Sequence, residues 1–549
     1  MKQSKALALL KSGKNVFLTG SAGTGKTFVL NQYINYLRQR RVKVAITAST
    51  GIAATHLNGQ TIHSWSGIGI KDKITTKQLA FLSQKKYFAD KMEGVKVLII
   101  DEISMLHKNQ LDMVNEVLKF FKHGQSPFGG IQVIFCGDFF QLPPVGNETS
   151  REKFAFMSDA WQEANLSICY LTEQFRQKDS GLHSLLNQMR KGEVEQNLLE
   201  QLTQTKYNTI NTDSFTQLFT HNQEVNFINR EKLDSISEKP KIFKAKSKGK
   251  EGLLETLKKS VLTDEILELK KGAQVMFIKN NFEKGFSNGT LGKIISFSDE
   301  GFPVVETFDK QEIEAKPETW AIEDEKGTKM ASFTQIPLRL AWAITVHKSQ
   351  GMTLDAATID LSKTFEPGQG YVALSRLKSL DNLVLLGINE AALQIDALAR
   401  KADKRFQELS EGIDNQFSEN ELQKNFDAFV LHCDGIIDLK EIKKHQQKLE
   451  KKDTVLLTKE WVEKKLSIKE IAEERGLTEA TIANHLMKIK TLYPNLDLSA
   501  YKPEKSLINR VQKAFSQLNE EEKNSLKHIF DALNGEVSYT DIRLALMFL

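Results

Sequence analysis

The sequence predicts an α/β protein with two parallel-sheet domains and a separate all-helical domain at its C-terminal end. Between Asn15 and Leu171, short β-branched runs such as NVFLTG, VKVLIIDE and IQVIFCGD alternate with helical stretches such as TFVLNQYINYLRQR. Parallel strands that are buried on both faces have this composition. The pattern returns from SFTQLFTHNQEVNFIN to DNLVLLG, and after about Arg400 the chain becomes charged and helical.

Two insertions interrupt the α/β pattern. A polar, lysine-rich stretch without strand periodicity at about 66–94 predicts a short wedge subdomain. Short strands at about 235–330, parted by turn sequences such as Asn288-Gly289 and Lys326-Gly327, predict a small β-barrel. The predicted segments are 1–180 and 181–400 for the two α/β domains, 401–450 for a helical linker and 451–549 for the helical domain.

The composition is that of an ordinary globular protein. The 549 residues are 26% charged and 40% hydrophobic, and the net charge is only +5, so binding to a polyanion would depend on local basic grooves. Cys136, Cys169 and Cys433 lie far apart without a C-x-x-C pair, which argues against a zinc ribbon or a disulfide framework. We therefore expect a reducing, cytoplasmic location, with no signal peptide and no membrane span.

A phosphate-binding loop follows the first predicted strand. The sequence GSAGTGKT lies between a strand and a helix, the context in which G-x-x-x-x-G-K-T binds nucleotides. Its glycines let backbone N–H groups surround phosphates, Lys26 neutralises the β- and γ-phosphates, and the Thr27 hydroxyl can ligate Mg²⁺. The alternative is a purely structural glycine-rich turn. The predicted ATP-binding residues are Gly20, Ser21, Ala22, Gly23, Thr24, Gly25, Lys26 and Thr27.

Two carboxylates end a buried strand later in the same domain. Asp101 and Glu102 follow the apolar run VKVLII, at the sheet edge where ligands bind. Asp101 can hold Mg²⁺, and Glu102 can orient or deprotonate an attacking water. Alone, the pair could be an ordinary strand end, but the phosphate-binding loop favours the catalytic interpretation.

A third strand ends in the segment GDFFQLPPV. Gln141 can sense the γ-phosphate from this strand end, while Phe140, Pro143 and Pro144 form a rigid apolar platform suited to base stacking. The alternative is a plain proline-rich turn.

At this point the sequence resembles the Pif-one and RecD branch of superfamily-one helicases. Pro127 to Gly130, PFGG, looks like the Pif-one signature region. The similarity continues in order through TASTGIAA, GQTIHSW, LTEQFRQ, THN, AITVHKSQG and YVALSR. Because six or more motifs occur in the same order, the match is highly specific.

The resemblance implies two RecA-like domains with ATP and Mg²⁺ in the cleft between them. Arg176 and Arg376 would reach the γ-phosphate, a role suited to a fixed cationic fork, although each taken singly could be an ordinary surface arginine. Gln3 would read the adenine, and Gln350 and Gly351 would complete the ATP site. The implied catalytic residues are Lys26, Asp101, Glu102, Gln141, Arg176 and Arg376, and the metal ligands are Thr27 and Asp101.

The resemblance also implies a path for single-stranded DNA across both domains. Small hydroxyls, amides and lysine suit phosphate oxygens, and aromatic faces suit bases. Any one of these side chains could instead serve packing, above all His347, which could be a structural hydrogen-bonding residue. The implied DNA-binding residues are Thr50, His63, Trp65, Phe140, Pro143, Pro144, Thr220, His221, Asn222, Thr345, His347 and Lys348.

The C-terminal sequence LSIKEIAEERGLTEATIANHLMKI has helix-turn-helix spacing, with a turn at Gly476-Leu477 and Thr478 as the N-cap of the second helix. It resembles the module at the C-terminus of some RecQ-type and Pif-type helicases. One interpretation directs Thr481, Asn484 and His485 toward a DNA groove. The other is a trihelical module that contacts a protein, and the sequence does not choose between them.

Together these observations predict an ATP- and Mg²⁺-dependent 5′ to 3′ DNA helicase that serves replication, repair or recombination. We expect a monomeric motor that acts on single-stranded DNA and DNA junctions in association with the bacterial nucleoid. One alternative is an ATP-switched DNA-binding regulator that uses the helix-turn-helix. Another is a translocase that strips proteins from DNA without separating strands, or one that prefers RNA.

Overall fold

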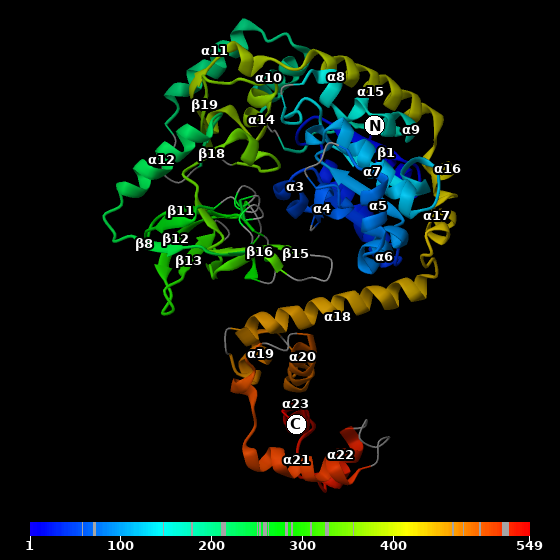
Figure 1. Cartoon of the computed structure of the whole chain (residues 1–549), viewed down its shortest axis with the longest axis vertical. Helices are drawn as coiled ribbons and strands as arrows, with labels where there is room; N and C mark the ends of the chain where they lie inside the picture. The colour runs from blue at the N-terminus through cyan, green and yellow to red at the C-terminus, as the bar shows by residue number, and fades with distance from the viewer. Residues whose placement is uncertain are drawn as a thin grey trace. The chain divides into compact units, whose positions relative to one another are not determined.

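The computed structural model forms two compact units, Met1–Ile437 and Asp438–Leu549. Each unit is considered by itself below (Figure 1). The described residues are all of 1–549 except 58, 70–72, 147, 177–178, 210–215, 250, 252–253, 256–257, 259–260, 262, 280, 282–283, 287–288, 308–309, 324–328, 355, 464–465, 476, 493–495, 519–525 and 549. Parts of the sequence prediction therefore lie outside the described residues, among them Gln177, Ser214, Phe215, Asn288, Lys326, Gly327 and Gly476.

The first domain is built on a six-stranded parallel sheet, as predicted. Its order is β3-β2-β4-β5-β1-β6, so the carboxyl ends of β4, β5 and β1 are neighbours. Loops that follow these strands meet at one edge, where ligands bind in sheets of this kind. The strands are β1 Val16–Gly20, β2 Val44–Ala48, β3 Gln60–Thr61, β4 Val97–Asp101, β5 Gln132–Cys136 and β6 Ser167–Leu171.

Helices cover both faces of this sheet because side chains alternate along its buried strands. On β1, Phe17 packs into one core, with its ring 4.9 Å from that of Trp161, while Leu18 belongs to the core on the opposite face. The covering helices include α1 Gln3–Lys11, α2 Lys26–Gln39, α7 Lys108–Phe121 and α9 Asp159–Glu163. The insertion predicted at 66–94 is helical, with α5 Thr76–Ser83 and α6 Lys86–Gly94 anchored by Leu79 and Met92.

Helix α15, Ala397–Gln416, includes residues of the predicted linker yet packs on the first domain. Phe406 is buried against Phe17, with ring centroids 5.0 Å apart. The Ser410 hydroxyl accepts a hydrogen bond of 3.0 Å from the Tyr170 N–H of β6. The first part of the predicted linker therefore contributes to the core of the first domain.

The second α/β domain has a four-stranded parallel sheet of order β18-β7-β19-β20. Its strands are β7 Gln217–Phe219, β18 Ala343–Thr345, β19 Ala357–Leu361 and β20 Leu383–Ile388. Its helices include α10 Ser180–Lys191, α11 Gln196–Gln204, α12 Asn222–Asp234 and α14 Gln369–Ser375. Both α/β predictions are thus confirmed at the level of fold class.

The β insertion of the second domain is antiparallel and extends to Leu340, beyond the predicted end at about 330. Its described strands form sheets of order β14-β13-β12-β11-β17, β15-β16-β9 and β10-β8. Leu267, Val275, Phe277, Ile294 and Val305 form part of its core. These strands are β8 Lys241–Lys244, β9 Lys246–Gly249, β10 Ile266–Leu269, β11 Gln274–Phe277, β12 Leu291–Phe297, β13 Pro303–Thr307, β14 Glu312–Glu314, β15 Glu318–Glu323, β16 Lys329–Gln335 and β17 Leu338–Leu340.

The second unit is helical throughout its described residues. Its helices are α18 Leu439–Glu463, α19 Ile468–Glu474, α20 Glu479–Leu492, α21 Lys505–Gln517, α22 Leu526–Ala532 and α23 Tyr539–Met547. Ser467 begins α19 with a capping box, and the Thr478 hydroxyl accepts the Thr481 N–H as predicted. In the described part of the chain, no helix is both long and apolar enough to cross a membrane.

One residue of the DNA-groove interpretation, His485, does not face outward. His485 is buried, and its Nδ1 lies 2.6 Å from the Thr458 hydroxyl of α18, so the ring packs inward and is not directed toward a DNA groove. Asn484 is exposed and Thr481 is half-buried. The exposed surface of α20 therefore presents fewer of the three side chains of the DNA-groove interpretation than the sequence indicated.

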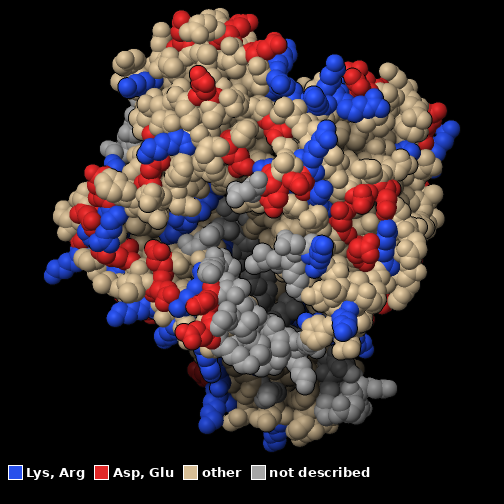
Figure 2. All heavy atoms as spheres, turned by 45° about the horizontal axis from the view of Figure 1, so that its top comes forward, with Lys and Arg blue, Asp and Glu red and all other residues tan. Residues whose placement is uncertain are grey.

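Charged side chains of both signs are interspersed on the face of the molecule in Figure 2. This distribution agrees with the net charge of +5. Contact with a polyanion must therefore depend on particular grooves, as the composition indicated.

The segment Pro127–Gly130 is a tight turn held by one buried ring. Phe128 is fully buried with φ of 52°, and its N–H donates to Asn115 Oδ1 over 2.6 Å. At Gly129, φ is 65°, and an added Cβ would lie 2.7 Å from the Leu118 carbonyl oxygen of α7. Gly130 has a similar φ of 79°, but the nearest atom to its added Cβ is 3.7 Å away.

We predict that Gly129→Ala lowers the free energy of unfolding by about 2 kcal/mol or more, because the methyl group overlaps fixed backbone. Gly130→Ala is the matched control and should cost about 1 kcal/mol, the penalty of the left-handed conformation alone. Thermal unfolding of the full chain followed by calorimetry measures both variants. Equal losses of stability would contradict the steric explanation.

Candidate functional site

The glycine-rich loop Gly20–Thr27 lies between β1 and α2 and closes on itself. Lys26 Nζ donates to the carbonyl oxygens of Gly20 and Ser21 over 2.8 and 3.1 Å. Gln3 Nε2 donates to the Thr24 carbonyl over 3.0 Å, which places this first-helix side chain on the loop. Gly25 has φ of 80°, a left-handed conformation that favours glycine, and a Cβ there would lie 2.2 Å from Gln3 Nε2 and displace this amide from the loop.

The two predicted carboxylates lie beside this loop. Burial, followed by the neighbouring Glu102, raises the pKa of Asp101 to about 7. The Glu102 carboxylate accepts from Gln350 Nε2 over 3.1 Å, so a side chain of the second domain reaches it. A buried carboxylate that resists ionisation in this way suits a position beside a cation.

A hard divalent cation fits the oxygen donors present. The Thr27 hydroxyl and the Asp101 carboxylate offer the ligands that Mg²⁺ prefers, and Mg²⁺ commonly takes its remaining ligands from waters and phosphates. The described residues contain no group of three or more His, Cys, Asp or Glu side chains that could hold a metal. Thr27 and Asp101 are therefore suited by their chemistry to hold Mg²⁺ beside the phosphate-binding loop.

Two glutamines meet across the cleft. Gln141 and Gln350 are both buried, and Gln350 Nε2 lies 3.5 Å from Gln141 Oε1. Gln350 Oε1 is buried and has no hydrogen-bond partner among the described residues. An acceptor left in this state costs about 1 to 3 kcal/mol, which points to a missing donor such as water in the cleft.

The two predicted arginines lie together on the other side of this cleft. Arg176 Nη1 donates to the Ser375 carbonyl over 3.1 Å, while Arg376 is bound by the Val372 carbonyl and the Ser375 hydroxyl. In the described part of the chain, neither has an ion pair with a carboxylate within 4.0 Å. Burial, followed by repulsion from Arg176, lowers the pKa of Arg376 to about 10. An anion between them would relieve both effects.

These groups surround a cavity of about 370 Å³. It brings together the phosphate-binding loop, the carboxylate Glu102 and both arginines from the predicted catalytic set. The lining also includes Phe175 and Thr353, which the sequence did not indicate. Its full lining is Ala22, Gly23, Gly25, Lys26, Thr27, Glu102, Gln141, Phe175, Arg176, Gly351, Thr353 and Arg376.

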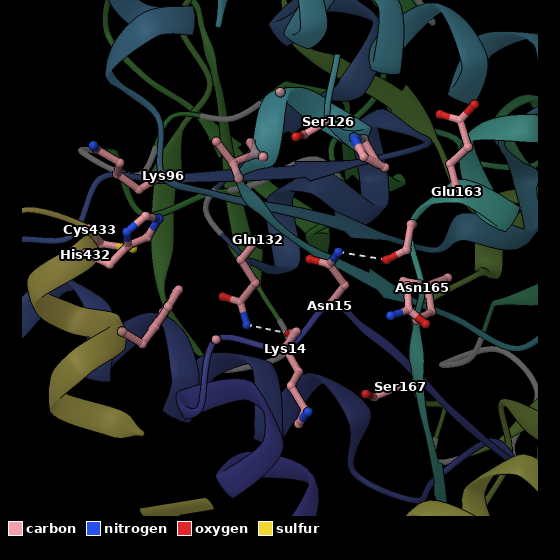
Figure 3. A pocket seen from close by; sticks show the side chains of 18 of the residues that line it. Lys14, Asn15, Lys96, Ser126, Gln132, Glu163, Asn165, Ser167, His432 and Cys433 are labelled. Carbon is pink, nitrogen blue, oxygen red and sulfur yellow. Dashed lines mark hydrogen bonds between the residues drawn. The ribbon is translucent and has the colours of Figure 1, made fainter. Parts of the chain in front are cut away.

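A larger cavity of about 820 Å³ lies at the opposite, amino ends of the strands (Figure 3). Asn15, Gln132 and Ser167 stand where β1, β5 and β6 begin. Gln132 Nε2 donates to the Leu10 and Lys14 carbonyls, and Asn15 Nδ2 donates to the Ala164 carbonyl. Because these amides are already satisfied by the chain, the smaller cavity is the better candidate site despite its size.

The side chains predicted to stack on bases are buried in this structure. Trp65 is 3% exposed in the core of the first domain, and Phe140 is 2% exposed. The Arg190 guanidinium lies 4.1 Å from the centre of the Phe140 ring. Pro143 and Pro144 are buried as well. Tertiary packing therefore covers these apolar faces.

Other predicted DNA-binding residues also have structural roles. Thr50 is half-buried, and its hydroxyl accepts the Ala53 N–H at the start of α3, Gly51–His56. Burial lowers the pKa of the half-buried His63. Thr220 and Thr345 are buried at the ends of β7 and β18. Asn222 is exposed at the start of α12.

A row of aromatic rings is accessible on the second domain. Phe365 is 58% exposed, and its ring centroid lies 5.0 Å from that of His221 and 6.5 Å from that of His347. Lys348 follows His347, and burial, followed by repulsion from Arg339, lowers the pKa of Lys348 to about 8. The sequence prediction missed Phe365, because KTFEPG matches no motif; its only signal was an aromatic residue in a loop after a strand.

Comparisons with known proteins point in one direction. The family described as "PIF1-like helicase" matches residues 2–212, "DNA helicase Pif1, 2B domain" matches 252–297, and "Helix-turn-helix domain" matches 454–546. The ATP-dependent DNA helicase Pif1 of Psychrobacter is 44% identical, and the match covers all of both chains. The ATP-dependent DNA helicase PIF1 of Xenopus laevis is 38% identical over 69% of this chain and 60% of its own length.

Solved structures agree. Pif1 helicase from Candida albicans superposes with a TM-score of 0.69 at 35% identity, covering 73% of this chain and 98% of that one. Pif1 helicase from Bacteroides, in complex with ADP-AlF3 and single-stranded DNA, gives a TM-score of 0.60 at 31% identity, covering 74% and 96%.

Proposed function

Because this chain belongs to the PIF1-like helicase family, we propose that it moves 5′ to 3′ along one strand of DNA and separates duplexes, driven by ATP with Mg²⁺. The family gives the activity of an ATP-dependent DNA helicase and two RecA-like domains followed by a helix-turn-helix module. The proposed polarity is supported by the ordered motifs that the chain shares with this branch of helicases. We further propose that the chain serves DNA replication, repair or recombination in the bacterial cytoplasm, in association with the nucleoid.

The observation that carries the proposal is the pair of arginines without a counter-anion. Arg176 and Arg376 face the same cavity as Lys26, yet neither forms an ion pair with a carboxylate within 4.0 Å among the described residues. The γ-phosphate of ATP is an anion of suitable size and charge to join them to the phosphate-binding loop. Loss of that phosphate on hydrolysis would remove the bridge between the arginines and the phosphate-binding loop. The distance between the two domains would therefore depend on whether ATP or ADP is bound.

The remaining cleft residues suit hydrolysis. Thr27 and Asp101 would hold Mg²⁺, which would neutralise charge on the phosphates. Glu102 would orient and deprotonate the attacking water, and the unpaired Gln350 Oε1 would accept a hydrogen bond from the same water. Gln141, hydrogen-bonded to Gln350, would report the γ-phosphate to the second domain.

The exposed ring of Phe365, between His221 and His347, is the best-supported base contact. Asn222 and Lys348 would contact the sugar-phosphate backbone nearby. The solved relatives include Bacteroides Pif1 bound to single-stranded DNA and Pif1 helicases at forked DNA. Single strands and forks are therefore the proposed substrates, while a monomeric motor and a DNA or protein partner for the C-terminal module stay predictions.

Strand separation tests the proposal directly. We expect the purified chain, with Mg²⁺ and ATP, to unwind a duplex with a 5′ single-stranded tail and to leave the same duplex with a 3′ tail intact. Unwinding of only the 3′-tailed duplex would contradict the polarity. DNA-stimulated hydrolysis without unwinding of either would favour a protein-stripping translocase or an RNA substrate, and hydrolysis without any response to nucleic acid would favour a regulator.

Arg376→Ala should retain nucleotide binding but lower DNA-stimulated turnover at least about 100-fold, because the variant lacks the buried guanidinium that stabilises the negative charge of the transition state. Arg405→Ala, on the exposed side of α15, is the control and should behave as wild type because Arg405 pairs only with the exposed Glu408 among the described residues. Steady-state ATPase assays with and without single-stranded DNA measure the effect. Unchanged kinetics in Arg376→Ala would contradict a cleft that closes on the γ-phosphate.

Phe365→Ala should weaken binding to a single-stranded oligonucleotide about tenfold, the effect of losing one stacked base. Tyr207→Ala is the matched control, since Tyr207 is 81% exposed on the same domain and no histidine ring of the described residues lies beside it. Fluorescence anisotropy with a labelled oligonucleotide gives both affinities. If both variants lose affinity equally, the aromatic row is not the base contact.

A further inference from the structure

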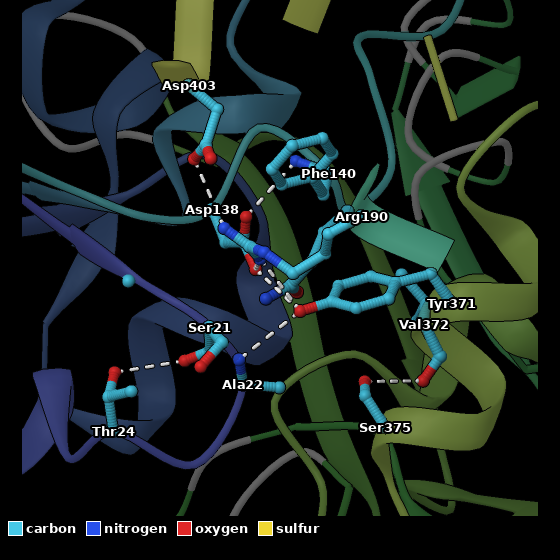
Figure 4. A network of polar contacts seen from close by, with 12 residues as sticks. Ser21, Ala22, Thr24, Asp138, Phe140, Arg190, Tyr371, Val372, Ser375 and Asp403 are labelled. Carbon is cyan, nitrogen blue, oxygen red and sulfur yellow. Dashed lines mark hydrogen bonds and ion pairs between the residues drawn. The ribbon is translucent and has the colours of Figure 1, made fainter. Parts of the chain in front are cut away.

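A buried arginine joins three parts of the first unit (Figure 4). Arg190 lies on α10 of the second domain, and its Nη1 donates to Asp138 Oδ2 and the Tyr371 hydroxyl over 2.8 and 2.9 Å. Its Nη2 donates to the Tyr170 hydroxyl and Asp403 Oδ1 over 2.7 and 3.1 Å. Asp138 and Tyr170 belong to the first domain, Tyr371 to the second, and Asp403 to α15.

The charge of Arg190 is fully compensated, unlike that of Arg376. Burial alone would lower the pKa of Arg190, but Asp138 and its other partners raise the pKa well above its ordinary value. The Phe140 ring covers the guanidinium at 4.1 Å. Four hydrogen bonds from two nitrogens and a covering aromatic ring suit the rigid fork of an arginine; a lysine ammonium offers the charge without that geometry.

The network reaches the nucleotide site through Tyr371. The Tyr371 hydroxyl accepts from the Ala22 N–H of the phosphate-binding loop over 3.4 Å and donates to Asp138 over 3.1 Å. Tyr371 lies on α14, the helix that ends beside Arg376. Asp138 also accepts the Phe140 N–H, at the start of the segment that carries Gln141. The Tyr371 hydroxyl therefore joins α14, which ends at Arg376, to the phosphate-binding loop and to Asp138, which precedes Gln141.

We propose that Arg190 is a positioning residue that holds α14, and with it Arg376, at the right distance from the phosphate-binding loop. The inference rests on the proposed function and goes beyond it, because Arg190 lines no part of the nucleotide cavity. Arg190 acts through Tyr371 and Asp138. Its bond to Asp403 extends the same arrangement to α15, so the position of this helix is tied to the arrangement of the cleft.

Two variants test the proposal, because Arg190→Ala would leave two buried carboxylates uncompensated and could unfold the chain. Tyr371→Phe removes only the hydroxyl that joins α14 to Ala22, and Arg190→Lys keeps the charge without the fork. Tyr33→Phe is the matched control: the Tyr33 hydroxyl is buried in the first domain, away from the cleft, and donates to Gln132 over 2.6 Å. The affinity for fluorescent ADP is measured with and without aluminium fluoride, together with the unfolding temperature and DNA-stimulated turnover.

We expect both test variants to bind ADP within about twofold of wild type but to lose about tenfold or more of the tightening that aluminium fluoride gives, with a similar loss of turnover. Tyr33→Phe should match wild type in affinity and turnover. Tightening equal to the control, or a parallel loss of ADP affinity and unfolding temperature, would overturn the positioning role. If wild type itself shows neither tightening nor DNA-stimulated turnover, the proposed function fails first and the inference fails with it.

Discussion

Two guanidinium groups lie next to each other at the boundary of two parallel-sheet domains, and no carboxylate of the described chain forms an ion pair with either of them within 4.0 Å. Arg376 is 2% exposed, and its pKa is lowered by burial and by Arg176. Holding an uncompensated buried charge costs several kcal/mol, a cost that the surrounding fold must offset. The arrangement is therefore stable only because α14 is fixed by other contacts, and it leaves the cleft strongly attractive to an anion.

Arg190 shows how the fold supplies those contacts. It is buried, as Arg376 is, but it has two carboxylate partners, Asp138 and Asp403. Breaking a satisfied buried pair of this kind typically costs about 3 to 5 kcal/mol, so the network resists rearrangement. One buried arginine is thus fully neutralised and rigid, while its neighbours stay unneutralised and available. This difference separates a structural arginine from a ligand-binding one more clearly than burial alone.

The sequence predicted the features that depend on backbone order. Lys26, Asp101 and Gln141 lie at one sheet edge because β1, β4 and β5 are adjacent parallel strands. Apolar runs that end in glycine or a carboxylate are enough to predict this arrangement from the sequence. The sequence did not predict side-chain exposure. Trp65 and Phe140 are apolar and adjacent to functional motifs, but neighbours distant in sequence bury them. Phe365, by contrast, stays exposed because no distant part of the described chain buries its ring. Only the fold brings its ring beside that of His221.

The same limitation applies to the end of the motor. Charged, helical spelling after Arg400 indicated a linker, yet Phe406 fills the core between β1 and α9, and Val430 packs in the core on the opposite face of the sheet. Asp403 and Gln407, one turn apart on α15, bind each other and the Tyr170 hydroxyl, which receives a bond from Arg190. A chain that stopped at residue 400 would lose a buried aromatic ring and one of the two carboxylates that neutralise Arg190. The part of the chain that hydrolyses ATP therefore extends through α15. Asp403 of α15 helps to neutralise Arg190, and Arg190 holds α14 and Arg376 in place.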